Sequence, residues 1–557
     1  MKQNFQEATD FANQELAVYL KRRFQASDEV VTWALAVHQS YREGHTALAV
    51  PEPPAIEKAL NHGGHSPLTW ADGLLSFTRC FHEEERLAQR FAALAKYQPR
   101  PSEIQGHRIE ALTLNSLQAA ATYLPFFFQL GILTGGPGTG KTTVLAQLLV
   151  HQFADRQARG LPLPRIALAA PTGKAAFRMG ESLRNALCKI PAEFSALLAT
   201  LEPQTLHRLL GIRSAVGAPK YHSEHPFDAD LIVIDEASMI SLTLMDQLLD
   251  ALPESATLIL MGDPDQLSSV EPGNVLGDLT KVFAANSFSA DWWAMTGSPT
   301  GHEKSYSGTP SPLVKLEHSY RFSDDKEIGR LAQLTLKGET EPLSEFLTNL
   351  GTGGQVSLHA LDAGAIENFA ASYSLFLAAQ TPEAALEALN HHMLLTLTNE
   401  GPWGQRTLNE LLFERFSKEK PLSLWPVMIT ENDPRLNLFN GDLGVAFRTD
   451  RVRVYFQRSD KKPAVFLENQ LPSHTIAFAM TIHKSQGSEF AHVSLVIPEV
   501  QPEGFVPTRQ LFYTGLTRAK EQVSLWMSEK SVQQSVQTQE IRQTGLVSKL
   551  HHQLKLG

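Results

Sequence analysis

The segment GGPGTGKT at residues 135–142 constrains the fold more than any other part of the chain. It fits the phosphate-binding loop pattern G-x-x-x-x-G-K-[ST]. The strand-like run Leu130–Thr134 precedes it and the helical pattern Thr143–His151 follows it, which is the context that the motif requires. Glycines let backbone N–H groups converge on phosphate oxygens, and the following helix adds the positive end of its dipole. The segment therefore predicts a nucleoside triphosphate site, and the alternative of an ordinary glycine-rich turn does not explain the Lys-Thr pair.

Each residue type in this loop suits one part of a Mg²⁺-ATP ligand. Lys141 is expected to neutralise the β- and γ-phosphates, and the hydroxyl of Thr142 is expected to ligate Mg²⁺. The complete set of expected nucleotide-binding residues in the loop is Gly135, Gly136, Pro137, Gly138, Thr139, Gly140, Lys141, Thr142 and Thr143.

An acidic pair follows a second apolar strand pattern. Asp235 and Glu236 come directly after Leu231–Ile234, at the expected carboxyl end of a strand. Asp235 is placed to hold Mg²⁺ and Glu236 to activate water. Such a pair is often no more than an exposed strand end. Its distance from the phosphate-binding loop, about one α/β domain, favours the catalytic interpretation.

The chain reads as an α/β protein with two successive alternating blocks. In the first block, strand patterns at Leu130–Thr134, Arg165–Ala170, Leu231–Ile234 and Thr257–Met261 alternate with helical patterns, which predicts a parallel sheet covered on both faces. The expected domains are a helical N-terminal domain at 1–105, a first α/β domain at 106–312 and a second at 313–557, with a small β insertion at about 424–471.

The segment 287–312 is rich in Gly, Ser and Pro and has no periodicity. It predicts a long surface insertion within the first α/β domain. The alternative is a contact with a partner or with DNA through Trp292 and Trp293.

Composition sets limits on the compartment and on the partners. Only two cysteines are present, Cys80 and Cys188, which favours a reducing cytoplasmic location. The uncharged stretch 111–140 is interrupted by polar residues and glycines, so no membrane span is expected. The 49 Lys and Arg residues against 59 Asp and Glu give a net charge of −10. This argues against a protein that coats nucleic acid by charge, while a locally basic groove stays possible.

A series of further motifs resembles the superfamily 1 DNA helicases, and within them the RecD family. Together with the phosphate-binding loop, the motifs are LAAPTGKAA (168–176), TLHRLL (205–210), IDEASM (234–239), MGDPDQL (261–267), SYRF (319–322), TIHKSQGSEF (481–490) and YTGLTRAK (513–520). They occur in the order of that family and cover about three-quarters of the chain. The resemblance implies two RecA-like motor domains, an SH3-like β insertion in the second, and a helical N-terminal domain that docks onto companion subunits.

The resemblance also implies roles for four residues outside the loop. Gln266 would sense the γ-phosphate or orient the attacking water. The alternative interpretation is that Gln266 is only a turn residue. Arg321 and Arg518 would approach the γ-phosphate from the second motor domain, although a single arginine is usually a surface ion-pair partner. Gln118 would read adenine, and its alternative is a solvated helix residue.

The resemblance implies single-stranded DNA contacts at seven positions, where small hydroxyls, backbone amides and a few cations suit a strand gripped by its phosphates. These positions are Pro171, Thr172, Thr205, His207, Thr481, His483 and Lys484. His207 and His483 could instead be satisfied core histidines.

The function implied is an ATP-dependent 5′→3′ helicase or translocase subunit that acts on single-stranded DNA at duplex ends. Its partners would be RecB-like and RecC-like subunits in a heterotrimer for double-strand-break repair and recombination. Two alternatives stay open. One is a self-sufficient superfamily 1B helicase, and the other is a P-loop ATPase subunit with a regulatory role only.

Overall fold

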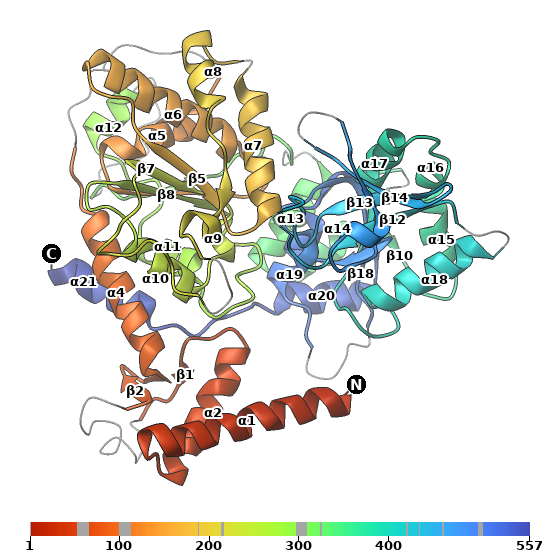
Figure 1. Ribbon diagram of the computed structural model, residues 1–557, viewed down its shortest axis with the longest axis horizontal. Helices are drawn as coiled ribbons and strands as arrows, with labels where there is room; N and C mark the ends of the chain where they lie inside the picture. Colours follow the sequence, from red (N-terminus) through yellow and green to blue (C-terminus); the bar gives the residue numbers. More distant parts are fainter. Residues whose placement is uncertain are drawn as a thin grey trace.

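The computed structural model arranges the chain in two α/β lobes with the N-terminal elements beside the first lobe (Figure 1). The structure describes residues 2–52, 66–99, 113–187, 189–212, 217–296, 309–322, 326–351, 353–418, 422–433, 435–458, 462–499 and 505–556, without the side chains of residues 2–10. Within this described part of the chain, no helix is both long enough and apolar enough to cross a membrane.

The first lobe is built on a six-stranded sheet in the order β6-β5-β7-β8-β4-β9, and every neighbouring pair is parallel. The strands are β4 (Leu130–Gly135), β5 (Ile166–Ala170), β6 (Gln204–Thr205), β7 (Leu231–Ile234), β8 (Thr257–Gly262) and β9 (Leu313–Leu316). All residues of β4, β7 and β8 are buried, because helices cover both faces of the sheet. The four strands predicted from apolar runs are therefore confirmed.

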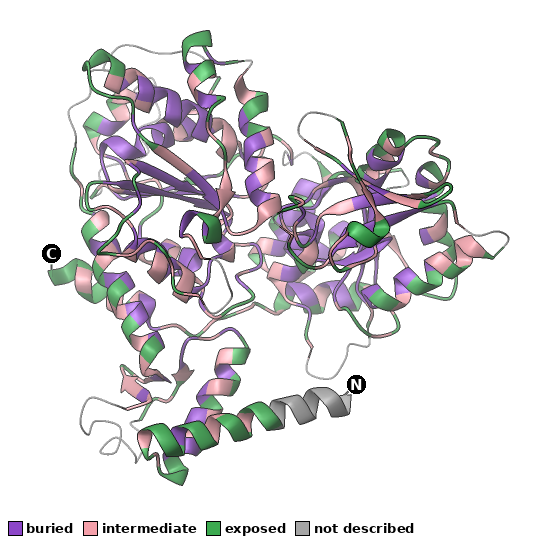
Figure 2. Ribbon diagram, in the orientation of Figure 1, coloured by how far each residue is buried: buried purple, intermediate pink, exposed green. Residues whose placement is uncertain are grey.

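Two separate apolar clusters fill the faces of this sheet. The central strands between them are buried along their length (Figure 2). One cluster packs beneath α5 (Ser116–Thr122), α6 (Lys141–Ala158), α7 (Gly173–Leu187), α8 (Ala192–Leu198) and α12 (Ala290–Met295). The other packs beneath α4 (Thr78–Leu94), α9 (Leu206–Leu209), α10 (Leu242–Asp250), α11 (Val275–Val282) and α21 (Leu546–Leu556).

The second lobe has a five-stranded parallel sheet in the order β10-β19-β18-β11-β17. Its strands are β10 (Val356–His359), β11 (His392–Thr396), β17 (Ala479–Thr481), β18 (Phe490–Val496) and β19 (Ala519–Trp526). Its helices are α13 (Glu327–Lys337), α14 (Thr340–Thr348), α15 (Ala365–Ser372), α16 (Ser374–Leu377), α17 (Pro382–His391), α18 (Gln405–Ser417), α19 (Arg509–Leu516) and α20 (Glu529–Gln537). Two parallel-sheet lobes are what the RecA-like expectation requires.

The predicted β insertion is a five-stranded antiparallel sheet in the order β15-β14-β13-β12-β16. Its strands are β12 (Leu424–Ile429), β13 (Leu443–Arg448), β14 (Val452–Phe456), β15 (Ala464–Leu467) and β16 (His474–Ile476). The last strand lies beyond the predicted end at 471. The sequence missed β16 because it is only three residues long and pairs with β12, far back along the chain.

The N-terminal region contains α1 (Lys2–Phe24) and α2 (Asp28–Arg42), as expected, but it is not all-helical. A small antiparallel sheet of β1 (Leu48–Ala49), β2 (Leu68–Ala71) and β3 (Leu74–Phe77) lies between α2 and α4. Asp72 and Gly73 join β2 to β3 with φ of 52° and 76°. An Asp-Gly pair between apolar runs is a hairpin signal, and this one was missed.

Two features of the first lobe differ from the sequence expectation. Strand β9 pairs with β4 of the first sheet, although the predicted boundary at 312/313 assigns it to the second domain. The start of the expected surface insertion 287–312 is the helix α12, and Trp292 within it is fully buried. The ring of Trp292 contacts Phe127 and Phe288, and its indole N–H donates to the carbonyl of Ala120. This core role contradicts a DNA or partner contact by Trp292, and residues 297–308 lie outside the described part.

The C-terminal helix α21 returns from the second lobe to the first and packs against α4 and α11 (Figure 1). The buried carboxylate of Glu84 on α4 anchors it. Glu84 accepts hydrogen bonds from the backbone N–H of Gly545 at 2.9 Å and from Nζ of Lys549 at 2.6 Å. Burial of this carboxylate is compensated because it has charged and hydrogen-bonding partners.

Candidate active site

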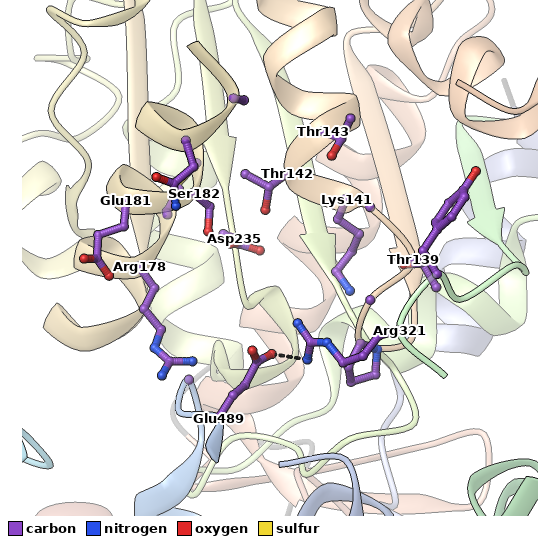
Figure 3. Close-up of a pocket in the computed structure, with 18 of the residues that line it drawn as sticks. Thr139, Lys141, Thr142, Thr143, Arg178, Glu181, Ser182, Asp235, Arg321 and Glu489 are labelled. Carbon is purple, nitrogen blue, oxygen red and sulfur yellow. Dashed lines mark hydrogen bonds and ion pairs between the residues drawn. The ribbon is translucent and has the colours of Figure 1, made fainter. Parts of the chain in front are cut away.

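A cavity of about 730 Å³ lies between the two lobes at the carboxyl end of the first sheet. The phosphate-binding loop, Asp235 and Arg178 line it from the first lobe, and Glu489 lines it from the second (Figure 3). Arg518 of the second lobe also lines it. The loop, Asp235 and Gln266 follow β4, β7 and β8, which are neighbours in the sheet. The parallel sheet thus brings together residues far apart in the sequence, such as Lys141 and Gln266, which are 125 positions apart.

The loop itself has the conformation that its glycines allow. Gly138 and Gly140 have φ of 77° and 86°, a region that side-chain-bearing residues rarely adopt. A Cβ at Gly138 would lie 2.3 Å from the Cβ of Arg321, so no larger residue fits there. The ammonium of Lys141 donates to the carbonyls of Gly135 and Gly136, at 2.6 and 3.2 Å. These weakly basic acceptors hold the cation beside the cavity.

Gln118 lies on α5 directly behind the loop and is buried. Its amide N–H donates to the carbonyl of Thr139 at 2.9 Å, while its Oε1 accepts from the backbone N–H of Asn115 and from the hydroxyl of Tyr320. The alternative of a solvated helix residue is therefore wrong. In this structure the side chain braces the loop and lines the cavity.

Asp235 and Glu236, which are consecutive in the chain, both line the cavity. Burial and the neighbouring Glu236 raise the pKa of Asp235 to about 6, while Lys141 opposes this shift. Glu236 has a φ of 52°, a left-handed conformation that costs a residue with a Cβ on the order of 1 kcal/mol or more. Backbone strain of this kind concentrates at functional sites, where the surrounding structure maintains it.

The two predicted arginines come from different lobes, and one assignment needs correction. Arg321 follows β9 and belongs to the first lobe, not the second, because Tyr320 and Ser319 hydrogen-bond to the carbonyls of Gly138 and Pro137. These bonds fix Arg321 against the phosphate-binding loop. Arg518 follows α19 and belongs to the second lobe, as expected.

Arg518 and Gln266 meet across the lobe boundary and both are buried. The Nη2 of Arg518 donates to Oε1 of Gln266 at 2.9 Å, and its other nitrogens donate to the carbonyls of Thr514 and Ser488. Arg518 is thus no surface ion-pair partner, and Gln266 is more than a turn residue.

Glu489 and Arg178 are cavity residues that the sequence reasoning did not single out. Glu489 of the second lobe forms an ion pair with Arg321 at 2.5 Å, and Arg178 points toward the same carboxylate from α7 (Figure 3). Burial by itself raises the pKa of Glu489, but Arg321, Arg178 and Arg518 together lower it to about 2. Glu489 lies inside the motif at 481–490, and Arg178 lies two residues after the motif at 168–176. Closeness to these motifs was the signal that the sequence offered for both.

The candidate DNA residues follow strand ends in both lobes. Pro171 and Thr172 follow β5, and Thr205 ends β6. Thr481 ends β17 and is buried, with its hydroxyl accepting from the backbone N–H of Lys484. His207 and His483 are exposed, so the alternative of core histidines is wrong for both.

A loop of the β insertion, residues 437–442, reaches from the second lobe to these positions. A Cβ at Gly173 would lie 2.4 Å from Cγ of Phe439, and Nζ of Lys174 donates to the carbonyl of Gly441 at 3.1 Å. Burial lowers the pKa of Lys174 to about 7. The insertion thus contacts the segment that carries Pro171 and Thr172 in the other lobe.

Two parallel-sheet lobes, with a phosphate-binding loop facing charged residues across a cleft, define a P-loop ATPase motor. Residues 118–272 match the AAA domain family, and residues 476–526 match the UvrD-like helicase C-terminal domain. The RecBCD enzyme subunit RecD of Haemophilus influenzae is 32% identical over 534 residues, covering 86% of this chain and 81% of the relative. The chain belongs to the RecD family of superfamily 1 helicases and is an ATP-dependent DNA helicase of that family.

Two further relatives and one solved structure are also similar to this chain. The RecBCD enzyme subunit RecD of Mycolicibacterium smegmatis is 32% identical, covering 90% of this chain and 87% of that protein. The ATP-dependent RecD2 DNA helicase of Deinococcus radiodurans is 29% identical, covering 71% of this chain but 46% of that protein. Among solved structures, Bacteroides Pif1 bound to single-stranded DNA aligns with a TM-score of 0.41 and 17% identity, covering 75% of this chain and 94% of that one.

Proposed function

We propose that this chain is the RecD-type subunit of a RecBCD-type complex and moves 5′→3′ on single-stranded DNA from duplex ends. The cavity between the lobes carries this proposal, because it places Arg321 and Glu236 of one lobe opposite Arg518 and Glu489 of the other. A triphosphate bound there would contact both lobes, so that its hydrolysis changes how they are held together. Each lobe also carries candidate DNA contacts, which is what a stepping motor needs.

The donor set suits Mg²⁺ together with the phosphates of ATP. Thr142 and Asp235 both line the cavity, and oxygen donors of this kind are what Mg²⁺ prefers. The raised pKa of Asp235 marks a carboxylate whose charge is poorly compensated in the protein alone. A divalent cation would supply that compensation, and when bound it neutralises charge on the β- and γ-phosphates.

The remaining roles belong to the chain's own residues. Glu236 acts as the base for the attacking water, while Lys141, Arg321 and Arg518 stabilise charge on the transferring phosphoryl group. Gln118 lies on the side of the pocket that takes adenine. Gln266 contacts the γ-phosphate and, at the same time, Arg518.

The substitution Lys141→Ala tests this site. We expect it to abolish ATP hydrolysis stimulated by single-stranded DNA, because the charge beside the phosphates is lost. The exposed Lys530 on α20 provides a control, and Lys530→Ala should leave turnover unchanged. Circular dichroism and thermal melting establish that both variants are folded. DNA-stimulated turnover that survives in Lys141→Ala would rule out the proposed site.

The complex with RecB-like and RecC-like subunits is supported by the relatives named above, which are subunits of RecBCD enzymes. We propose that the N-terminal region, predicted at 1–105, is the docking domain and that the complex works in the cytoplasm. Purification of the complex from its native cells, followed by native mass spectrometry, tests this. A monomer alone in that measurement would contradict it.

A self-sufficient helicase is the second candidate, because the Deinococcus RecD2 helicase is also similar. The two candidates differ in one measurement. The purified chain alone should fail to unwind a 5′-tailed duplex if it needs partners, and should unwind it if it is self-sufficient.

A further inference from the structure

A chain of buried hydrogen bonds crosses the boundary between the two lobes behind the ATP site. It runs from Arg518 to Gln266 at 2.9 Å, from Nε2 of Gln266 to Oδ2 of Asp263 at 3.0 Å, and from the hydroxyl of Tyr513 to the same Oδ2 at 3.3 Å. No member of the chain is more than 6% exposed. Asp263 and Gln266 follow β8 of the first lobe, whereas Tyr513 and Arg518 lie on and after α19 of the second.

The chemistry of the chain fixes which way the amide of Gln266 faces. A guanidinium can only donate, so Arg518 must face the amide oxygen. A carboxylate oxygen accepts from an N–H, and Oδ2 of Asp263 thus holds the amide nitrogen on the opposite side. Without that carboxylate the amide could rotate and turn its N–H groups toward Arg518, where two donors would repel each other. Asp263 therefore holds the amide of Gln266 with its oxygen toward Arg518.

Tyr513 in turn holds Asp263 and contacts the phosphate-binding loop. A Cβ at Gly136 would lie 2.9 Å from the hydroxyl oxygen of Tyr513, and the carbonyl of Gly136 accepts from Lys141. Burial and the negative charge of Asp263 raise the pKa of Tyr513, so its hydroxyl stays protonated and remains a donor. The neighbouring Thr514 also accepts from the backbone N–H of Leu267, which locks α19 onto the same segment of the first lobe.

Asp263 and Tyr513 differ from their two partners in one respect. Gln266 and Arg518 line the cavity, whereas Asp263 and Tyr513 do not. Any effect of these two residues on ATP hydrolysis must therefore pass through Gln266 and Arg518 or through the loop.

We infer that Tyr513 and Asp263 are positioning residues for ATP hydrolysis, which hold the amide of Gln266 in the one orientation that accepts a hydrogen bond from Arg518 across the lobe boundary. This inference rests on the proposed function of the site. Asp263 and Gln266 belong to one lobe, and Tyr513 and Arg518 belong to the other. The series of hydrogen bonds is therefore complete only when the two lobes are in contact, so contact between the lobes and the correct orientation of Gln266 occur together.

The substitutions Tyr513→Phe and Asp263→Asn test the inference in the full-length chain. Each keeps the shape of the side chain, while the first removes the hydroxyl and the second replaces an acceptor by a group that also donates. We expect kcat for DNA-stimulated ATP hydrolysis to fall about 10- to 100-fold, the loss typical when a hydrogen bond that orients a functional side chain is removed. The KM for ATP should change less than about threefold, because the residues that line the cavity are intact.

Tyr373→Phe is the matched control. Tyr373 is also a fully buried tyrosine, and its hydroxyl contacts the carbonyl of Phe478 and the backbone N–H of Leu394 inside the second lobe. Its loss should cost stability without lowering kcat. If Tyr513→Phe and Asp263→Asn both keep kcat within twofold, or if Tyr373→Phe lowers kcat as much, the inference is wrong. If Tyr513→Phe unfolds at a lower temperature than the parent chain, kcat of the Asp263→Asn variant decides whether the inference holds, provided that this variant is folded.

The outcome is separable from that of the proposed function. If Lys141→Ala abolishes turnover while Tyr513→Phe and Asp263→Asn do not reduce it, only the positioning inference fails. If Lys141→Ala retains turnover, the proposed site itself fails.

Discussion

Replacing Glu489 by glutamine should lower the free energy of unfolding by about 3 kcal/mol at neutral pH. The pKa of Glu489 is lowered from 4.5 to about 2, and each pKa unit corresponds to about 1.4 kcal/mol of preference for the charged form. Its side chain is 22% exposed, so solvent screens the pair with Arg321 only weakly. Glutamine keeps the shape and removes the charge that the three arginines share.

The effect has a defined pH dependence. Since the folded pKa lies below the ordinary value, the stabilisation is fully present above about pH 4.5. It is lost as the pH falls from about 4.5 through about 2, where the folded-state carboxylate takes up its proton. The difference between the parent chain and Glu489→Gln should therefore be constant between pH 6 and 8 and shrink below about pH 4.5.

Hydrogen exchange measures this locally. Peptides that cover residues 317–322 and 486–490 should exchange about 100-fold faster in Glu489→Gln, since about 1.4 kcal/mol is a factor of ten. The control is Glu410→Gln, whose carboxylate is 65% exposed and lies 3.9 Å from Arg406, a surface pair worth at most about 1 kcal/mol. Unchanged exchange in Glu489→Gln at pH 7, or a difference that persists undiminished at pH 3, would refute the reasoning.

Two further predictions concern stability. Trp292→Ala should destabilise the first lobe by about 3–5 kcal/mol in thermal melts, because it empties a fully buried site. Trp293→Ala should destabilise it less, because Trp293 is partly exposed. Equal losses for the two variants would contradict this core assignment. Glu84→Gln should release α21 by about 2–3 kcal/mol, because a charge-assisted bond to Lys549 is lost, while Glu85→Gln, whose side chain is 45% exposed, should not. Protease cleavage within α21 measures the release, and equal protection in both variants would contradict it.

The local sequence was enough to predict the parts of this protein that depend on neighbouring residues. The strand–loop–helix around Lys141 needs its own glycines and its own apolar run, so the motif specifies it directly. The buried strands β7 and β8 are continuous apolar runs because helices cover both faces of their sheet. The antiparallel insertion was likewise visible from short β-like runs separated by turn residues.

The partnerships between distant residues were decided only by the tertiary structure. Arg321 was assigned to the wrong lobe because nothing near it in the sequence reveals that β9 pairs with β4. Trp292 stood in a segment with the composition of a loop, and only the surrounding aromatic rings make it a core residue.

The same division applies to the site. Its P-loop lysine and acidic pair were readable from the sequence, because each belongs to a short motif with its own local geometry. The ion pair of Glu489 with Arg321 and the bond of Tyr513 to Asp263 join residues 168 and 250 positions apart. Such contacts depend on how two sheets are placed against each other. That placement is set by burial of apolar surface over the whole chain, which no local pattern encodes.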